Sequence, residues 1–415
     1  MSNDAHIITE IVDQYIDMVP FLWTQRNRAI DAPYYSLKDL SDLDDRLEAH
    51  IDGLRVAGDP GWDLCEAALE EDDPGLVFAA GVLAFENFDG ERIDTVVSQG
   101  SRSRANFQGM VSALGWLTDQ QFSEVVASFL RANSNQYLRL AIAGCGIRRF
   151  DPGDALTQAV GSEDLFLRRR ALIAVGELKR QDLLSELSRN RQHENYSCRL
   201  AAAISMLLLG DKSALDTIGQ FVLAQSPFRV SSMQVALRAA DLRTSQSWLK
   251  SLVAEPDTMR DMLIGAGITG DPVYVPTLIK CMDDPDLARV AGGAFSMITG
   301  IDLAYEDLDG DWPEGFESGP DDDPEDENVD MDADEDLPWP DKELISERWR
   351  KIKVDFASGT RYLAGKPITS EHCVAVMKNG MQGQRNAAAL ELALMQPDRP
   401  YFNTAAPGFR QEGAL

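Results

Sequence analysis

A repeated spacing of arginines constrains the fold of this chain more than any other feature of its sequence. In the middle of the chain, an Arg recurs at the start of runs rich in Ala and Leu, at intervals of 30, 30, 30, 31 and 29 residues. These positions are Arg139, Arg169, Arg199, Arg229, Arg260 and Arg289. At all of them except Arg260, a small residue follows two positions later. A period near 30 is typical of helix-pair repeats, in which each pair buries its apolar faces only by stacking on its neighbours.

The turns between the apolar runs have the chemistry of helix ends. Asp-Pro recurs between these runs; Asp caps the N–H groups at a helix start and Pro suits the first helical position. The pairs begin at Asp59, Asp73, Asp151, Asp271 and Asp284. Gly is expected to end several runs, as at Gly176 and at the Gly-Asp turns of Gly210 and Gly270. Because no segment alternates with period two, we predict an all-α chain, an α-solenoid of helix pairs with essentially no sheet.

Two amphipathic helices are expected before the repeats. Apolar residues recur at helical spacing over residues 7–19, and Pro20 is expected to kink or end that helix. Ser36 and Asp39 have the spacing of a capping box at the start of the second helix, which Gly58 closes. Each helix has an apolar face that needs a partner surface.

The charge balance limits the kinds of partner. The 415 residues include 68 acidic and 39 basic side chains, which gives a formal net charge of −29. Such a surface repels nucleic acids and anionic membranes at long range and favours partners with a basic surface. We therefore expect a protein partner, no nucleic acid and no membrane insertion, and the sequence leaves the oligomeric state open.

The cysteines and the first residues indicate the compartment. The five cysteines are far apart, are odd in number and form no CxxC pair, so we predict buried small side chains in a reducing compartment. They are Cys65, Cys145, Cys198, Cys281 and Cys373. Residues 1–10 lack the basic and apolar regions of a secretory signal, and no apolar run has the length of a membrane span. We expect a cytoplasmic protein.

A block of acidic residues interrupts the helical pattern. Residues 306–336 contain 17 acidic side chains and no Lys or Arg, so we expect an exposed, partly disordered loop. Three interpretations are open: a solvated linker, a docking strip for a basic partner, or a calcium site. Asp307, Asp309 and Asp311 match the first acidic positions of an EF-hand loop. Trp312 replaces its required Gly, however, and Ser318 replaces its bidentate Glu.

In the docking interpretation, the densest acidic stretch and two flanking aromatic residues form the candidate partner-binding site. Its members are Asp321, Asp322, Asp323, Glu325, Asp326, Glu327, Trp312 and Trp339. Tryptophan is enriched at the energetic centres of protein interfaces. The same two aromatic residues could instead pin the ends of the loop to the repeats.

A further helical module is expected after the acidic block. A basic helix begins at Lys342, residues 361–365 have the pattern of a helix end with Gly at the cap, and Arg385 repeats the helix-start pattern. The predicted organisation is an N-terminal helical cap (1–58), the repeat array (59–300), an acidic and flexible insert (301–341), a C-terminal helical module (342–396) and an extended strap or loose tail (397–415).

Several strings carry a resemblance to a known family. The Arg-x-x-Ala-type helix starts and Gly-Asp turns resemble HEAT-like repeats of the phycobilisome-lyase type, and four strings resemble a family of bacterial HEAT-like proteins of unassigned function. These strings are EAHIDGLR (48–55), GDPVYVP (270–276), ITGIDL (298–303) and GQRNAAALE (383–391). The resemblance runs nearly end to end. Members of that family are often encoded near type VI secretion genes, which implies a role around that machine but no catalytic residues. The phycobilin-lyase relatives attach bilin pigments.

No pattern of residues indicates catalysis, so we predict no catalytic residue, no metal and no cofactor. The histidines are not at metal-ligand spacing, and His50 is expected at a surface or capped helix position. His372 and Cys373 are adjacent, so their side chains diverge on a helix. The Gly-rich stretch 265–270 lies between helices and not after a strand, so it does not indicate a dinucleotide site.

The arginine ladder, with Arg385 as its seventh member, has two interpretations. In the first, the guanidinium groups bond carbonyls or Asp of neighbouring repeats. In the second, some of them line a groove that holds an acidic ligand. We predict a non-catalytic adaptor, chaperone or scaffold that binds other proteins. The alternatives are a bilin-lyase-like or other enzyme whose site is assembled only in the fold, and a structural oligomer subunit.

Overall fold

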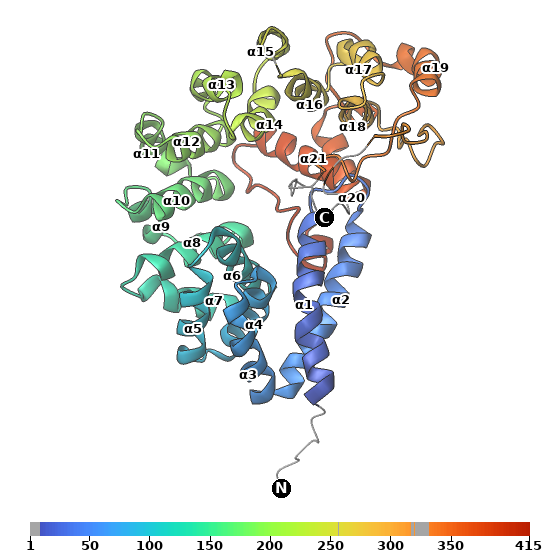
Figure 1. The fold of residues 1–415 in the computed structure, drawn as a ribbon. Helices are drawn as coiled ribbons and strands as arrows, with labels where there is room; N and C mark the ends of the chain where they lie inside the picture. Colours follow the sequence, from blue (N-terminus) through green and yellow to red (C-terminus); the bar gives the residue numbers. More distant parts are fainter. Residues whose placement is uncertain (1–8, 256, 317–318, 320–331) are drawn as a thin grey trace. The chain divides into compact units, whose positions relative to one another are not determined.

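The computed structural model describes residues 9–255, 257–316, 319 and 332–415, and this part of the chain is all-α as predicted (Figure 1). Its only sheet within those residues is a two-stranded antiparallel hairpin, β1 (Tyr362–Leu363) and β2 (Lys366–Pro367), and one isolated bridge joins Asp309 and Pro340. The helices fall into two compact units. Unit 1 comprises the described residues up to Asp31, Tyr35–Leu209 and Pro397–Leu415; unit 2 comprises Ala32–Tyr34 and Gly210–Gln396.

The helices of unit 1 follow one another with short turns. They are α1 (Thr9–Ala29), α2 (Leu37–Ala57), α3 (Asp59–Ala68), α4 (Pro74–Asn87), α5 (Gly90–Gly100), α6 (Arg104–Trp116), α7 (Asp119–Arg131), α8 (Asn135–Arg148), α9 (Asp154–Ala159), α10 (Leu165–Leu178), α11 (Leu184–Asn190), α12 (Tyr196–Leu208) and α22 (Gly408–Glu412), with 3-10 turns at Leu69–Glu71 and Gln181–Leu183. In this unit α6, α8, α10 and α12 pack in a row, each on the next, while α5, α7, α9 and α11 each pack on the helix that follows them.

Unit 2 repeats this arrangement and adds a C-terminal part. Its helices are α13 (Leu215–Leu223), α14 (Arg229–Ala239), α15 (Leu242–Val253), α16 (Met259–Thr269), α17 (Val275–Cys281), α18 (Ala288–Thr299), α19 (Lys342–Ile352), α20 (Ser370–Asn379) and α21 (Gln382–Met395), with 3-10 turns at Lys212–Ala214, Pro272–Tyr274 and Lys353–Asp355. Here α14, α16 and α18 form the row, and α13, α15 and α17 pack on them in turn.

The arginine ladder marks the starts of the row helices. Each of the six arginines lies within the first five residues of α8, α10, α12, α14, α16 or α18. The small residue two positions later is buried at Ala141, Ala171, Ala201 and Ala291, where a larger side chain would hold neighbouring helices apart. The period of about 30 residues therefore corresponds to one row helix and its partner.

Several predicted helix ends are confirmed. Ser36 caps α2 and forms a capping box with Asp39, and Gly58 closes that helix. Asp73 accepts hydrogen bonds from two N–H groups of the first turn of α4, with Pro74 as its first residue. The hydrogen bonds from Ser36 lower the pKa of the Asp39 carboxyl.

Other local predictions are wrong, and each has a physical reason. Gly176 does not end its helix but lies inside α10, where an added Cβ would come within 2.6–2.9 Å of Ser205 on α12. That glycine therefore serves close helix packing. Of the two outcomes expected for Pro20, a kink or a helix end, the second is wrong, because Pro20 lies within α1. Residues 361–365 do not end a helix, because Ala364 and Gly365 adopt φ of 47° and 81° and make the turn of the β1–β2 hairpin.

The apolar side chains of each unit form a buried core. Trp23, Trp62 and Trp116 are buried in unit 1, whereas Trp248 in unit 2 is half-buried. The cysteines are free thiols, and all are buried except Cys281, which is half-buried. Among the described residues, no helix combines the length and apolar character that crossing a membrane requires.

Candidate functional site

The acidic insert leaves and rejoins unit 2 through a closed base. The Gly310 N–H donates to the Trp339 carbonyl (2.9 Å), and the Asp341 N–H donates to the Leu308 carbonyl (2.8 Å). These two bonds hold the two ends of the insert side by side in an antiparallel bridge. The two ends of the insert are therefore fixed to each other at its base.

Two adjacent glycines allow this base to lie directly on α18. A Cβ added to Gly292 would meet the Leu303 side chain at 3.1 Å and the Pro340 ring at 3.3 Å, and one added to Gly293 would meet the Leu337 side chain at 3.2 Å. Glycine inside a helix costs about 0.5–1 kcal/mol relative to Ala. The close approach of the returning chain offsets that cost.

Arg289 lies at the centre of the base, in what we call the arginine clamp: Arg289, Asp332, Trp312, Phe316 and Trp339. Its guanidinium donates to both carboxylate oxygens of Asp332, at 2.5 and 3.0 Å. Its central carbon lies 4.8, 5.6 and 5.7 Å from the ring centres of Trp312, Phe316 and Trp339. The Arg289 side chain is only 4% exposed. A cation held by a bidentate carboxylate and three rings is well positioned to fix both ends of the insert.

A second arginine of the ladder holds the returning end of the insert. The Arg260 guanidinium is bonded to both oxygens of Asp334, with one distance of 2.7 Å, and the pKa of Arg260 is raised chiefly by that hydrogen bond. The Tyr34 hydroxyl donates to Asp336 at 2.8 Å. The insert is thus attached to the first turns of α16 and α18 by the arginines that the repeat pattern places there.

The structure describes two of the eight predicted partner-binding residues, Trp312 and Trp339. The six acidic candidates, Asp321, Asp322, Asp323, Glu325, Asp326 and Glu327, lie outside the described residues. Trp339 is 8% exposed and packs inside the clamp, whereas Trp312 is 51% exposed and packs against it at a tilt, with ring centres 5.4 Å apart. Trp312 is therefore the aromatic residue of the pair with a large accessible surface.

Most of the described acidic side chains of the insert remain without a basic partner. Between residues 306 and 336, three pair with arginines: Asp332, Asp334 and Glu306, the last with Arg348 at 2.9 Å. Six of them have no ion pair with a described Lys or Arg, namely Asp307, Asp309, Asp311, Glu314, Glu335 and Asp336. In the part of the chain that the structure describes, no three His, Cys, Asp or Glu side chains gather as they would around a metal ion.

Other members of the ladder bond within the fold. Arg229 pairs with Asp261 on α16 at 2.6 Å and donates to the Ala224 carbonyl. Arg199 donates to the carbonyls of His193 (3.2 Å) and Glu194 (3.4 Å). Arg385 is fully buried and donates to the Met377 carbonyl at 2.6 Å, and its burial lowers its pKa to about 10. Arg139 and Arg169 differ, because neither donates a hydrogen bond to a described residue.

A buried ion cluster in unit 2 was missed by the sequence analysis. Glu391 on α21 is 4% exposed and lies between Arg361 and Arg238, with the latter at 3.6 Å. Arg361 also donates to the Thr269 carbonyl at 2.9 Å, at the end of α16. The backbone N–H of Tyr362 donates to the Gly270 carbonyl. Arg361 and Tyr362 therefore connect Glu391, at the end of the string 383–391, with Gly270, at the start of the string 270–276. The available signal was an acidic residue, Glu391, among the Ala and Leu residues of α21.

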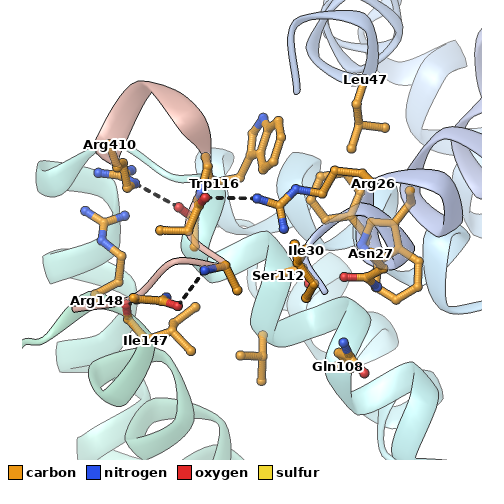
Figure 2. A pocket seen from close by; sticks show the side chains of 18 residues that line it. Arg26, Asn27, Ile30, Leu47, Gln108, Ser112, Trp116, Ile147, Arg148 and Arg410 are labelled. Atoms are coloured by element: carbon orange, nitrogen blue, oxygen red, sulfur yellow. Dashed lines mark hydrogen bonds between the residues drawn. The ribbon is translucent and has the colours of Figure 1, made fainter. Parts of the chain in front are cut away.

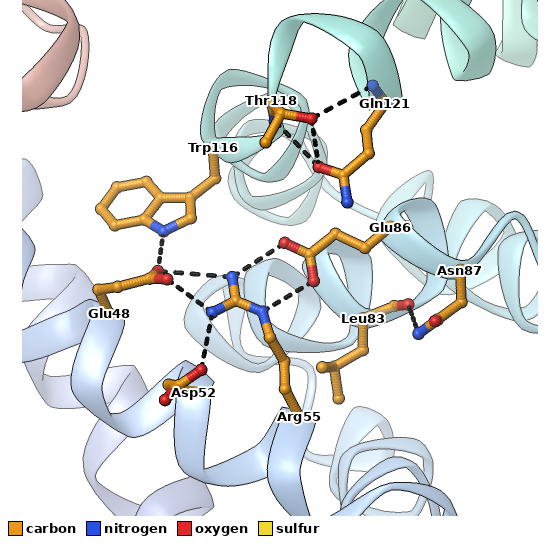
Figure 3. Close-up of polar contacts among 9 residues, drawn as sticks. All are labelled: Glu48, Asp52, Arg55, Leu83, Glu86, Asn87, Trp116, Thr118 and Gln121. Atoms are coloured by element: carbon orange, nitrogen blue, oxygen red, sulfur yellow. Dashed lines mark hydrogen bonds and ion pairs between the residues drawn. The ribbon is translucent and has the colours of Figure 1, made fainter.

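The string 48–55 forms a polar network in unit 1. Figure 3 shows the Arg55 guanidinium between Glu48 of its own helix and Glu86 of α4, at 2.6 and 2.8 Å. The Trp116 indole N–H on α6 donates to Glu48. The two carboxylates raise the pKa of Arg55 against the effect of its burial. These residues connect α2, α4 and α6 and are satisfied by one another.

A pocket of about 150 Å³ lies in unit 1 between α1, α6, α8 and the C-terminal tail (Figure 2). Asn403 donates to the Ile147 carbonyl and Arg26 donates to the Ala406 carbonyl, both at 3.0 Å, so the tail forms one wall. Sites for drug-sized ligands usually exceed roughly 300 Å³. This pocket is too small for a bilin-like molecule.

The three arginines that line this pocket are occupied by the protein. Arg26 pairs with Asp44 at 2.8 Å. Arg148 and Arg410 both donate to the Leu117 carbonyl and pair with Asp119. Burial, and then repulsion by Arg410, lower the pKa of Arg148 to about 10. The residues that line the pocket therefore hold the C-terminal tail in place. The three guanidinium groups bond to protein groups and not to a ligand.

Three buried thiols and two imidazoles among the described residues have surroundings that differ from those of catalytic groups. Burial raises the pKa of Cys65, Cys145 and Cys373 to about 12 each, which opposes thiolate formation. The His372 Nε2 lies 2.7 Å from the Leu363 carbonyl. His50 packs edge-on against Tyr15, and its Nδ1 is buried without a hydrogen-bond partner.

Comparison with known proteins adds no family assignment. No family model matches this chain, and no curated protein matches it in sequence. The candidate site is therefore judged on its own geometry: the arginine clamp, the acidic insert that it holds, and the remaining unpaired arginines.

Proposed function

We propose that this chain is a non-catalytic adaptor or scaffold, whose acidic insert binds a partner protein with a basic surface. The observation that carries the proposal is the arginine clamp, which fixes the base of an insert in which six of the described acidic side chains have no basic partner. A linker needs no such base. A docking loop benefits from one, because fixing its ends lowers the entropy lost on binding.

The charge of the insert supports the same reading. Six described acidic side chains beside the clamp have no basic partner, and the densest part of the sequence, 321–327, adds six more carboxylates. Complementary charge accelerates encounter with a basic protein and selects against acidic ones. Trp312, half-exposed at the clamp, supplies apolar contact area at the edge of the charged loop.

Resemblance suggests the setting in which such an adaptor works. The strings at 48–55, 270–276, 298–303 and 383–391 resemble HEAT-like proteins encoded near type VI secretion genes. On that basis we propose a cytoplasmic protein that holds a component or cargo of this machine. The raised pKa values of the buried thiols and the small pocket support a binding role over a bilin-lyase activity.

The test is affinity capture from native lysate at moderate salt, read by mass spectrometry. The intact protein is compared with a variant whose six acidic residues between 321 and 327 are changed to Asn or Gln, which leaves the clamp untouched. A matched control neutralises six exposed acidic residues of unit 1: Asp42, Asp45, Asp63, Glu66, Glu70 and Glu71. We expect a basic partner to be retained by the intact protein and the control and lost by the insert variant.

Two results would overturn the proposal. If all three proteins retain the same partners, the insert is a linker. If the control loses the partner as fully as the insert variant does, total charge and not the insert is responsible.

A further inference from the structure

Three consecutive row helices of unit 1 carry an arginine that has no carboxylate partner in the described part of the chain. Arg104 is the first residue of α6, and Arg139 and Arg169 are each the fifth residue of α8 and α10. None of the three forms an ion pair or donates a side-chain hydrogen bond to any described residue, and the Arg139 Nε is buried without a partner. In a chain with 68 acidic and 39 basic residues, carboxylates are abundant, so three neighbouring unpaired arginines are unexpected.

Two aromatic rings pack on Arg139, the middle one of the three, and Arg104 and Arg169 lie close enough to repel each other. The guanidinium carbon of Arg139 lies 4.1 Å from the ring centre of Phe107 on α6 and 5.6 Å from that of Phe166 on α10. Phe166 is 72% exposed. We call these five residues, Arg104, Phe107, Arg139, Phe166 and Arg169, the arginine–aromatic surface.

The electrostatics of this surface are unfavourable in the isolated protein. The pKa of Arg169 is lowered because its burial disfavours the charge and because Arg104 and Arg170 repel it. Burial also lowers the pKa of Arg139, and the negative charge of Asp164, which is not hydrogen-bonded to Arg139, partly offsets that decrease. The Asp164 side chain accepts hydrogen bonds from Phe166 N and Leu167 N as the cap of α10. Half-buried cations that repel each other gain most from an anion supplied from outside.

We propose that the arginine–aromatic surface of unit 1 binds an acidic segment of a partner protein, one that carries carboxylates around an aromatic or apolar residue. Arginine binds carboxylates through two parallel hydrogen bonds, and the exposed Phe166 ring offers a place for an apolar side chain. Nucleic acid is disfavoured by the net charge of −29, which repels a phosphate backbone at long range. This proposal is independent of the one made for the acidic insert, because the insert favours a basic partner and the arginine–aromatic surface favours an acidic one.

The experiment measures binding of a short fluorescent peptide of Asp and Glu around one Phe to the full-length protein by anisotropy. The test variant is Arg104→Gln with Arg169→Gln; the control is Arg46→Gln, an exposed arginine of α2. We expect the double variant to bind at least about tenfold more weakly and the control to bind normally. Added salt should weaken binding to the unaltered protein more than to the double variant.

Stability measurements separate docking from a structural role. Because removing Arg104 and Arg169 relieves repulsion and breaks no bond, the double variant should melt at the same or a higher temperature than the unaltered protein. Phe166→Ala should likewise fold normally and bind several-fold more weakly, since the ring is mostly exposed. A double variant that unfolds at a clearly lower temperature would indicate that these arginines stabilise the fold, contrary to the proposal.

Two further probes complete the test. A peptide with Asn and Gln in place of the acidic residues should not bind; equal binding would refute recognition of charge. A single-stranded oligonucleotide that binds more tightly than the acidic peptide would overturn the choice of a protein partner. The variant with a neutralised insert should bind the acidic peptide at least as well as the unaltered protein, so this proposal can fail or survive independently of the proposed function.

Discussion

The same helix-start arginine meets two different environments in the two units. In unit 2, Arg229, Arg260 and Arg289 each pair with an aspartate. In unit 1, Arg139 and Arg169 have no carboxylate partner among the described residues. The repeat thus determines where the arginine lies, and other parts of the chain determine whether it is satisfied.

The source of the partner explains the difference. Asp261 lies on the next row helix of unit 2, and Asp332 and Asp334 come from the acidic insert. Arg289 is nearly inaccessible as a result, because Asp332 and three aromatic rings enclose it. An arginine enclosed in this way stabilises the fold, whereas one left beside exposed rings is available to a ligand.

The largest effect that would test this comparison is expected for Arg289→Ala. It removes the cation that pairs with Asp332 inside the clamp, so we expect a loss of about 3 kcal/mol in the stability of unit 2, as for other broken buried pairs. Amide hydrogen exchange should accelerate in residues 308–316 and 332–341, which the clamp holds. Urea unfolding followed by exchange measures both.

The matched control for that variant is Arg169→Ala, the same substitution at an unpaired position of the ladder. It should change stability by less than about 0.5 kcal/mol, as is usual for a residue with no special contact. Similar losses in the two variants would show that pairing does not distinguish the two sets of arginines.

The comparison also shows what the sequence could predict of the fold. The all-α class, the starts of the row helices and the capping box of Ser36 and Asp39 followed from local patterns, because they depend on residues a few positions apart. Gly176 was misread for the opposite reason: its role depends on Ser205 of another helix. A glycine at a close helix contact and a glycine at a helix end are the same residue in the sequence.

The candidate site was predicted only in part. The positions of Arg260 and Arg289 were predicted, but their partners lie 74 and 43 residues further along the chain, beyond any local pattern. Trp312 and Trp339 were expected either to pin the ends of the insert to the repeats or to bind a partner. In the structure they lie in one cluster, with Trp339 buried and Trp312 exposed. The cluster of Glu391 with Arg238 and Arg361 was missed, since nothing local relates residues so far apart.

An intermediate effect is expected from His50, another basic group of unit 1 with an unpartnered nitrogen. Burial, and then repulsion by Arg46, lower its pKa below the ordinary 6.5. The folded state therefore binds this proton less readily than the unfolded state, and its contribution to stability is present above pH 6.5 and is lost as pH falls toward the folded pKa. Between about pH 7 and pH 5 the unaltered protein should lose more stability than His50→Phe, which keeps a ring beside Tyr15.

Thermal melting across that pH range measures the difference. The two proteins should have parallel profiles above pH 7, where the imidazole is neutral in both states. Parallel profiles over the whole range would mean that protonated His50 forms a hydrogen bond in the folded protein. Such a result would contradict the view that unit 1 contains basic groups without an acidic partner.

The smallest effect is expected from a substitution that gives Arg139 of unit 1 a carboxylate neighbour. Gln136 is exposed, lies three residues before Arg139 and is in the first turn of α8, so Gln136→Glu places an acidic side chain on the same helix face near a helix N-terminus. We expect a gain of about 0.5 kcal/mol, read by urea unfolding, and several-fold weaker binding of the acidic peptide. Gln136→Lys should do the reverse on both measurements, because it adds a like charge to the same place. If the Glu variant gained stability without losing peptide binding, Arg139 would be a structural residue that merely lacks a partner, and the contrast between the two units would reflect local packing and not function.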